Sequence, residues 1–299
     1  MWVVGIDEAG YGPNLGPLVQ AAIALELPDG DAAGWDALKS IVRQARGKGD
    51  GRILIDDSKK VFSRGGLAAL ENGLGRTLGI APGTLREFLQ RVLLPGCLDD
   101  IAAEFWFDGD ESLPLHDALD REPTFPSCFA VASLVPTKLF NRIVAGSNSK
   151  ATVLACGLTA LLANMANVGH GPLVVSCDKQ GGRNHYAAML AAAFPDGWVV
   201  PEVESADLSR YRIEHLARPI SISFRPRADG NSVAVALASM LCKYLREVCM
   251  EQFNRFWAKH VPGIAPTAGY PVDAKRFRAQ IGSAMQSLNL TDEDVWRSR

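Results

Sequence analysis

The sequence has little net charge, no CxxC pair and no apolar run long enough to span a bilayer. Its 31 Lys and Arg residues nearly balance 33 Asp and Glu residues, which excludes a general polyanion binder acting through its overall field. Any contact with nucleic acid must therefore come from local basic patches. The six cysteines lie among apolar neighbours, so we expect buried, reduced thiols and a cytoplasmic protein with no membrane contact. We also expect no secretory leader, because the first strand starts at residue 2 without a basic segment before it.

The chain of 299 residues is 47% hydrophobic, which is enough for a large core in one domain or two. Apolar runs alternate with helical patterns, which predicts an α/β fold. The stretch from about 95 to 126 differs, being acidic and rich in Pro and aromatic residues, and it indicates an insertion. The expected strands are 2–6, 18–27, 130–141, 173–177, 198–203 and 220–224, and the expected helices are 33–46, 149–168, 185–194 and 233–257, with further helical segments in 63–94.

The first nineteen residues carry the most informative pattern. A short apolar run ends in two adjacent acids, Asp7 and Glu8, followed by a loop rich in Gly and Pro. Paired carboxylates at the end of a buried strand repel each other and lose hydration, and a divalent cation removes both penalties. The alternative is an ordinary strand and turn with two solvated acids.

Two further acids follow the same logic. Asp178 ends the apolar run 173–177, and Asp229 precedes the best helical pattern, 233–257. Because sites in α/β sheets gather at the carboxyl ends of strands, the four acids could meet. Four converging carboxylates would hold two divalent ions, Mg²⁺ or Mn²⁺, as in phosphodiester cleavage.

Residues 5–19, GIDEAGYGPNLGPLV, resemble the opening signature of the type 2 ribonuclease H family (ribonucleases HII and HIII), usually GIDEAGRGPxxGPxV. Residues 57–60 resemble the DSKK block of that family, and 173–178 resemble the strand that delivers its third carboxylate. Asp229 and the helix after it match a fourth block, and Gly269-Tyr270 match its GYGT block. The resemblance spans most of the chain but leaves out residues from about 85 to 130.

The resemblance implies a ribonuclease H-like fold, with a mixed five-stranded sheet flanked by helices. It implies a single domain over 1–299, with an insertion or subdomain at about 85–130 and a short C-terminal helical extension at about 272–299. The implied activity is metal-dependent hydrolysis of the RNA strand, or of embedded ribonucleotides, in RNA/DNA duplexes. One metal would activate water and the other would stabilise the 3′-oxygen. The implied catalytic and metal-binding residues are Asp7, Glu8, Asp178 and Asp229.

The resemblance also implies a set of substrate contacts. Backbone atoms of the loop at residues 10–12 would read the ribose 2′-hydroxyl, and Tyr270 would pack at the nucleotide junction. Basic and hydroxyl side chains would meet phosphates. For Ser239, close helix–sheet packing is the alternative. The expected substrate-binding residues are Gly10, Tyr11, Gly12, Ser58, Lys59, Lys179, Arg183, Ser239, Lys243, Arg246 and Tyr270.

Three departures from the family pattern bear on substrate choice. Tyr11 stands where the family usually has Arg, and Pro271 replaces the Gly after Tyr270. The third acid is followed by residues 179–183, KQGGR, which place basic charge beside the expected metal and could accept a phosphate. A plain strand-to-helix turn is the alternative for that segment.

Other candidates have structural alternatives. His185 could shuttle protons or simply begin a helix. The aromatic run 105–107 could stack on bases or form a small core under the insertion. Five arginines could follow a duplex backbone or be ordinary exposed charges: Arg210, Arg212, Arg218, Arg225 and Arg227.

Three alternative functions remain open from the sequence. The first is a nuclease of the same fold that acts on another nucleic acid, such as structured DNA or RNA. The second is a non-catalytic nucleic-acid-binding module, although a phosphate-binding surface would gain by losing the four acids. The third is a small-molecule phosphohydrolase using the same carboxylates.

Overall fold

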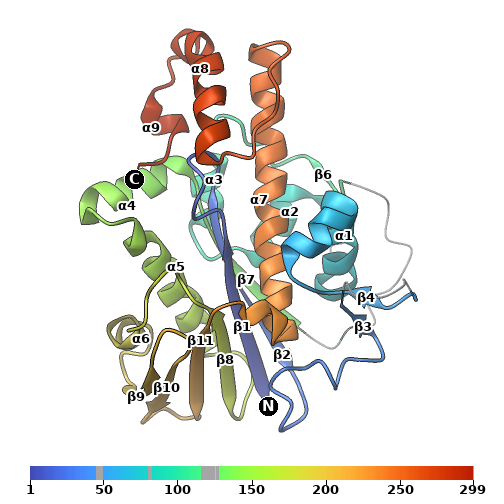
Figure 1. The fold of residues 1–299 in the computed structure, drawn as a ribbon, viewed down its shortest axis with the longest axis vertical. Coiled ribbons are helices and arrows are strands. Elements are labelled where there is room, and N and C mark those ends of the chain that lie inside the picture. Colours follow the sequence, from blue (N-terminus) through green and yellow to red (C-terminus); the bar gives the residue numbers. More distant parts are fainter. Residues whose placement is uncertain (45–49, 80–82, 116–124, 126–127, 299) are drawn as a thin grey trace.

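A seven-stranded mixed sheet, ordered β7-β2-β1-β8-β11-β10-β9, forms the centre of the computed structural model (Figure 1). The structure describes residues 1–44, 50–79, 83–115, 125 and 128–298. β1 pairs in parallel with β8, and β8 pairs in parallel with β11, whereas the other neighbours are antiparallel. These strands are β1 (Trp2–Ala9), β2 (Leu18–Glu26), β7 (Cys128–Val135), β8 (Leu173–Asp178), β9 (Trp198–Glu204), β10 (Ser209–Glu214) and β11 (Ile220–Arg225).

Helices cover both faces of this sheet. α7 lies across β1 and β2 on one face, together with α1, whereas α5 and α6 pack on the other face (Figure 1). The helices are α1 (Ser58–Leu78), α2 (Leu85–Val92), α3 (Cys97–Ala102), α4 (Thr137–Ser147), α5 (Lys150–Met165), α6 (Ala187–Ala193), α7 (Val233–His260), α8 (Pro271–Ser287) and α9 (Asp292–Val295). Two small sheets pair β3 (Val42–Arg43) with β4 (Ile53–Leu54) and β5 (Gly83–Thr84) with β6 (Ser112–Leu113).

β1 is buried on both faces because its side chains alternate between two cores. Val3 packs in the core under α7, and Val4 and Ile6 pack in the core under α5 and α6. Gly5 brings β1 against α7, because a Cβ atom at this position would lie 2.1 Å from the backbone of Ala234 and Val235. The strand that ends in Asp7 and Glu8 is therefore held directly against the longest helix in the described part of the chain.

The α/β class and the mixed sheet are confirmed, but the count of five strands is wrong. The antiparallel strands β9 and β10 extend the sheet beyond β11 and bring it to seven. β10 is fixed by pairing with β9 on one side and β11 on the other, so its place depends on partners distant in the sequence.

Two expected elements differ in the structure. No helix forms in the described part of 33–46, because the Asp31 carboxylate accepts hydrogen bonds from the N–H groups of Gly34 and Ala37, and Val42–Arg43 then pairs with β4. The strand expected at 130–141 ends at Val135. Pro136 cannot donate a ladder hydrogen bond and instead precedes α4.

The described part of the expected insertion packs on the main core. Phe105 and Trp106 make edge-on ring contacts with aromatic side chains of α7, which favours the packing alternative over base stacking. Residues 116–124, 126 and 127 of this insertion lie outside the described residues. The expected C-terminal extension consists of α8 and α9, and the division into domains stays a prediction.

All six cysteines are free thiols, but the expectation that they are buried holds only for Cys177, Cys242 and Cys249. Cys97 and Cys128 are partly buried and Cys156 is exposed. Within the described residues, no helix is both long enough and apolar enough to cross a membrane.

Candidate active site

A cavity of about 470 Å³ lies where β1 and β8 end. Asp7 and Glu8 come from the end of β1, and Asp178 ends the neighbouring parallel strand β8. The register pairs Ile6 with Cys177, so the next residues, Asp7 and Asp178, emerge side by side. Asp229 joins them from a 3-10 turn, η1 (Ala228–Gly230), which leads from β11 into α7. The structure thus brings the four predicted carboxylates into one cavity.

Burial and mutual repulsion disfavour the ionised forms of these carboxyl groups. Burial raises the pKa of Asp7 from an ordinary 3.8 to about 7; a hydrogen bond with Ser239 opposes this rise, and the charges of Asp178 and Asp229 add to it. Burial, followed by the charges of Asp7 and Asp178, raises the pKa of Glu8 well above its ordinary value. Burial is also the main cause of the raised pKa values of Asp178 and Asp229. A shared positive charge would relieve all four groups.

The donor set suits a hard divalent cation, although the side chains as they lie do not form a ligand cluster. Among the described residues, no three His, Cys, Asp or Glu side chains converge closely enough to hold a metal ion. Asp178 Oδ1 accepts a hydrogen bond from the Ala228 N–H (3.0 Å), and Asp229 Oδ1 accepts one from the Gly230 N–H (2.9 Å). Carboxylate oxygens are the ligands that Mg²⁺ and Mn²⁺ prefer, so the residues present fit these ions by their chemistry.

The glycine-rich loop after β1 is held by Arg246 of α7. Gly10 has φ +87°, and a Cβ there would lie 2.6 Å from Arg246 Nε and from the Pro17 carbonyl oxygen. The Arg246 guanidinium is buried and donates to the carbonyl oxygens of Leu15 and Ala268 at 3.3 and 3.0 Å. Gly10, Tyr11 and Arg246 line the cavity. Arg246 therefore supports the loop from behind in addition to lining the cavity.

The predicted phosphate-binding residues of α1 and α7 also meet here. Ser58 and Lys59 lie in the first turn of α1, and Ser239 and Lys243 lie on the facing side of α7; all four line the cavity. The Lys243 ammonium is 2.6 Å from the Glu247 carboxylate and lies 4.4 Å from the centroid of the Phe62 ring. Tyr270, 54% exposed, completes the set.

Three predicted residues do not line this cavity: Gly12, Lys179 and Arg183. Gly12 is exposed and has no side chain that could contact a ligand. The buried Lys179 ammonium donates to Asn184 Oδ1 (2.8 Å) and to the carbonyl oxygens of Arg183 (3.4 Å) and Ser205 (2.5 Å), so it fastens its own loop. Their phosphate-binding role stays a prediction.

His185 lies at the end of the same loop. Its imidazole is exposed and 2.8 Å from the Glu204 carboxylate on β9, which also hydrogen-bonds the Tyr211 hydroxyl. These contacts fit the structural alternative better than a proton shuttle.

The sequence did not single out Asp57 as a functional candidate, whereas Arg227 was expected on the duplex backbone track. Asp57 lines the cavity and caps α1 by accepting from the Lys59 and Lys60 N–H groups, at 2.7 and 3.4 Å. Its charge and a shared hydrogen bond add to the effect of burial on the Asp229 pKa. Arg227, which precedes η1 in a left-handed backbone conformation (φ 57°), lines the same cavity. The helix-capping position of Asp57 was a signal in the sequence, but its proximity to Asp229 was not.

A search of solved structures identifies the fold. Ribonuclease H2 from Pyrococcus horikoshii OT3 aligns with 99% of this chain and 92% of its own, at a TM-score of 0.53 and 15% identity. The chain has a ribonuclease H2-like fold.

Other structures match this ribonuclease H2-like chain at lower scores. Ribonuclease HII from Archaeoglobus fulgidus, solved in complex with PCNA, is 14% identical over 100% of this chain and 95% of its own, at a TM-score of 0.48. Bst ribonuclease HIII, solved with Mn²⁺, is 15% identical over 99% of this chain and 66% of its own, at 0.45. No protein-family model matches the sequence, and a search of curated proteins finds no match.

Proposed function

We propose that this chain is a metal-dependent endonuclease that hydrolyses the RNA strand, or embedded ribonucleotides, of RNA/DNA duplexes. One observation carries the proposal: Asp7, Glu8, Asp178 and Asp229 share a cavity with the glycine-rich loop and with the cations of Lys59 and Lys243. The ribonuclease H2-like fold and the sequence motifs support the same assignment. We also propose a cytoplasmic location.

The residues of the cavity would have three separate roles. The carboxylates would hold two divalent ions, Mg²⁺ or Mn²⁺, which when bound supply an activated water and stabilise the leaving 3′-oxygen. Lys59 and Lys243 would place a phosphodiester beside the carboxylates. The Gly10 backbone, kept in place by Arg246, would face the ribose 2′-hydroxyl, the group that distinguishes RNA from DNA.

Cleavage of two labelled duplexes tests the proposal. One is a continuous RNA/DNA hybrid and the other is DNA with a single ribonucleotide, each assayed in Mg²⁺ and in Mn²⁺. The wild-type protein should cut at least one of them, and the Asp7→Asn variant should cut neither while keeping its circular dichroism spectrum. Cutting by the pure variant at the wild-type rate, or no cutting of either duplex by the wild type, would overturn the proposal.

A nuclease with another nucleic-acid substrate is the second candidate. Tyr11 favours it, because an aromatic ring contacted by the Lys150 ammonium (4.6 Å to the ring centroid) lines the cavity where the family usually has Arg. A panel of structured DNA and RNA substrates separates the two candidates. Cutting of the panel but of neither duplex would favour the second.

A further inference from the structure

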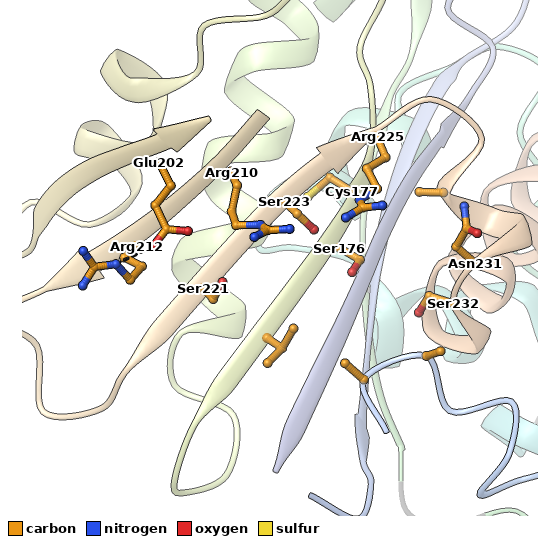
Figure 2. A pocket seen from close by; sticks show the side chains of 14 residues that line it. Ser176, Cys177, Glu202, Arg210, Arg212, Ser221, Ser223, Arg225, Asn231 and Ser232 are labelled. Carbon is orange, nitrogen blue, oxygen red and sulfur yellow. Dashed lines mark hydrogen bonds and ion pairs between the residues drawn. The ribbon is translucent and has the colours of Figure 1, made fainter. Parts of the chain in front are cut away.

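A second cavity of about 470 Å³ lies on the face of the sheet that also carries Asp7 and Asp178. α7 covers this face over β1 and β2 but leaves β8, β11 and β10 open (Figures 1 and 2). Because side chains alternate along strands, the open part presents every second residue. We call these side chains the serine–arginine face: Ser176, Arg210, Ser221, Ser223 and Arg225.

The positive charge of this face is not neutralised. Arg210 and Arg225 form no ion pair or side-chain hydrogen bond in the described part of the chain. The nearby acid, Glu202, is held by Arg212 at 2.5 Å. Figure 2 shows the Arg210 and Arg225 side chains on either side of Ser223. The register agrees, because Arg210 pairs with Ser223 and Arg225 follows Ser223 by two residues on the same face. Two cations therefore lie near each other, and neither forms an ion pair with an acid of the described residues.

Three hydroxyl groups near the arginines also lack partners, whereas Ser223 donates to the Val175 carbonyl oxygen (3.4 Å). The side chains of Ser176 and Ser221 make no hydrogen bond to the described residues. Ser232 precedes α7 and lines the same cavity; it is 3% exposed, and its Oγ is buried without a hydrogen-bond partner in the part of the chain that the structure describes. A buried hydroxyl without a partner is destabilising, because it has lost its hydrogen bonds to water. A ligand rich in acceptor oxygens would satisfy these groups and the arginines together.

The face is continuous with the candidate active site. Arg225 is the register partner of Asp178, so their Cα atoms lie about 5 Å apart on adjacent strands. Ala228 lines the second cavity, and the next residue, Asp229, lines the first. A chain of phosphates that passes the carboxylates can therefore extend over β11 towards β10.

We propose that the serine–arginine face binds the phosphate backbone of the nucleic-acid substrate on one side of the cut site. This inference rests on the proposed function and adds a contact surface outside the catalytic cavity. Arg210 and Arg225 would contact phosphates, and Ser176, Ser221 and Ser232 would donate to phosphate oxygens. The three remaining arginines of the expected backbone track are already engaged or lie elsewhere. Arg212 lines the same cavity but is paired with Glu202 and Glu214, Arg218 donates to carbonyl oxygens of 168, 169 and 171, and Arg227 lines the catalytic cavity.

The test measures duplex binding in the cleavage-deficient Asp7→Asn protein, so that binding is separated from cutting. Fluorescence anisotropy is recorded at several salt concentrations for this protein and for the same protein carrying Arg210→Ala and Arg225→Ala. Each lost phosphate contact should reduce the slope of log affinity against log salt by about 1, so the double change should reduce it by about 2. At low salt the affinity should fall on the order of tenfold. Lys259→Ala, at the exposed far end of α7, is the matched control and should change neither quantity.

Duplexes shortened from either side of the cut site locate the contact. Shortening the duplex on one side of the cut site should weaken its binding to the protein with intact arginines. The two proteins, with and without the arginines, should then bind the shortened duplex with equal affinity. An unchanged salt slope in the arginine variant, with cleavage by the wild type intact, would overturn this inference while leaving the proposed function standing. Calorimetric binding of inorganic phosphate to the face, with duplex affinity unaffected by the arginine changes, would overturn it as well. If the wild type neither binds nor cuts duplexes, the proposed function itself fails.

Discussion

Ser58 and Ser239, 181 positions apart in the sequence, are joined by a hydrogen bond of 3.0 Å between their hydroxyl groups. This contact links the first turn of α1 to the middle of α7 at the wall of the candidate active site. The Ser239 hydroxyl also faces the Asp7 carboxyl and opposes the rise of its pKa. The hydroxyl pair therefore connects two helices to the ionisation of the central acid.

We expect Ser239→Ala to move the acid limb of the pH–activity profile to higher pH. Asp7 must be ionised to hold a cation, and its pKa, already about 7, rises further when the hydrogen bond is lost. Cleavage near pH 6.5 should fall roughly tenfold and recover at higher pH, since a hydrogen bond to a charged group contributes about 1.5–3 kcal/mol. Ser58→Ala breaks the hydroxyl pair without removing the contact between Ser239 and Asp7. The acid limb of its pH–activity profile should therefore stay at the wild-type pH. Equal shifts in both variants would contradict this prediction.

Asp7→Asn should stabilise the protein without metal and prevent stabilisation by metal. Because the pKa of Asp7 is about 7 in the folded state and 3.8 ordinarily, the folded state binds more protons between these values. Stability of the wild type therefore falls as pH rises through this window. In EDTA at pH 8 the variant should be more stable by about 1–3 kcal/mol, and saturating Mg²⁺ should reverse the order. Urea unfolding with and without Mg²⁺ measures this, and a variant less stable than the wild type in EDTA would refute the explanation.

Gly10→Ala and Gly12→Ala should differ sharply in stability. A methyl group at Gly10 meets Arg246 and Pro17 at 2.6 Å in a left-handed backbone conformation, whereas one at Gly12 meets nothing within 4 Å. We expect Gly10→Ala to cost about 2 kcal/mol or more and Gly12→Ala to stay within about 0.5 kcal/mol of the wild type. Chemical denaturation of both variants gives the comparison. A neutral Gly10→Ala would show that the loop is not held as described.

Arg297→Met should stabilise the fold. The Arg297 side chain is 1% exposed and packs 4.9 Å from the centroid of the Phe140 ring, and its nitrogens have no hydrogen-bond partner among the described residues. Burial, helped by the charge of Arg246, lowers its pKa to about 9. The charged form is therefore disfavoured in the fold, and an apolar replacement should gain roughly 1–4 kcal/mol.

The pH dependence separates this effect from simple packing. A cation whose pKa is lowered on folding makes the wild type gain stability as pH rises above about 9. The difference in unfolding free energy between Arg297→Met and the wild type should therefore shrink from pH 8 to pH 10. A constant difference would point to packing alone.

The sequence predicted elements that are defined by their own residues. The apolar run 2–6 and the alternation at 220–224 became β1 and β11, and the long pattern from Val233 became α7. The sequence pattern gave the wrong secondary structure, or none, where a distant contact or a side-chain hydrogen bond determines the local conformation. The Asp31 carboxylate turns the chain where a helix was expected, and β10 is specified by pairing on both sides.

The candidate site was predicted through its motifs more than through local chemistry. The four acids and most of the substrate set line one cavity because the motifs end or begin the elements that meet there. Asp57 was missed because its closeness to Asp229 depends on how α1 docks on α7. The exclusion of Lys179 from the cavity depends on three hydrogen bonds within its own loop, which no spacing in the sequence indicates.

Gly5 limits how the sequence of this chain can change over evolutionary time. Any side chain at this position would collide with main-chain atoms of α7, which cannot rotate away as a flexible side chain can. β1 and α7 would have to separate, and the acids at the end of β1 would move away from Ser239 and Lys243. An exposed position with open space around it, such as Gly12, is under no such packing restraint. A glycine two residues before the first acid is therefore a marker by which distant members of such a lineage could be found after most other identity has been lost.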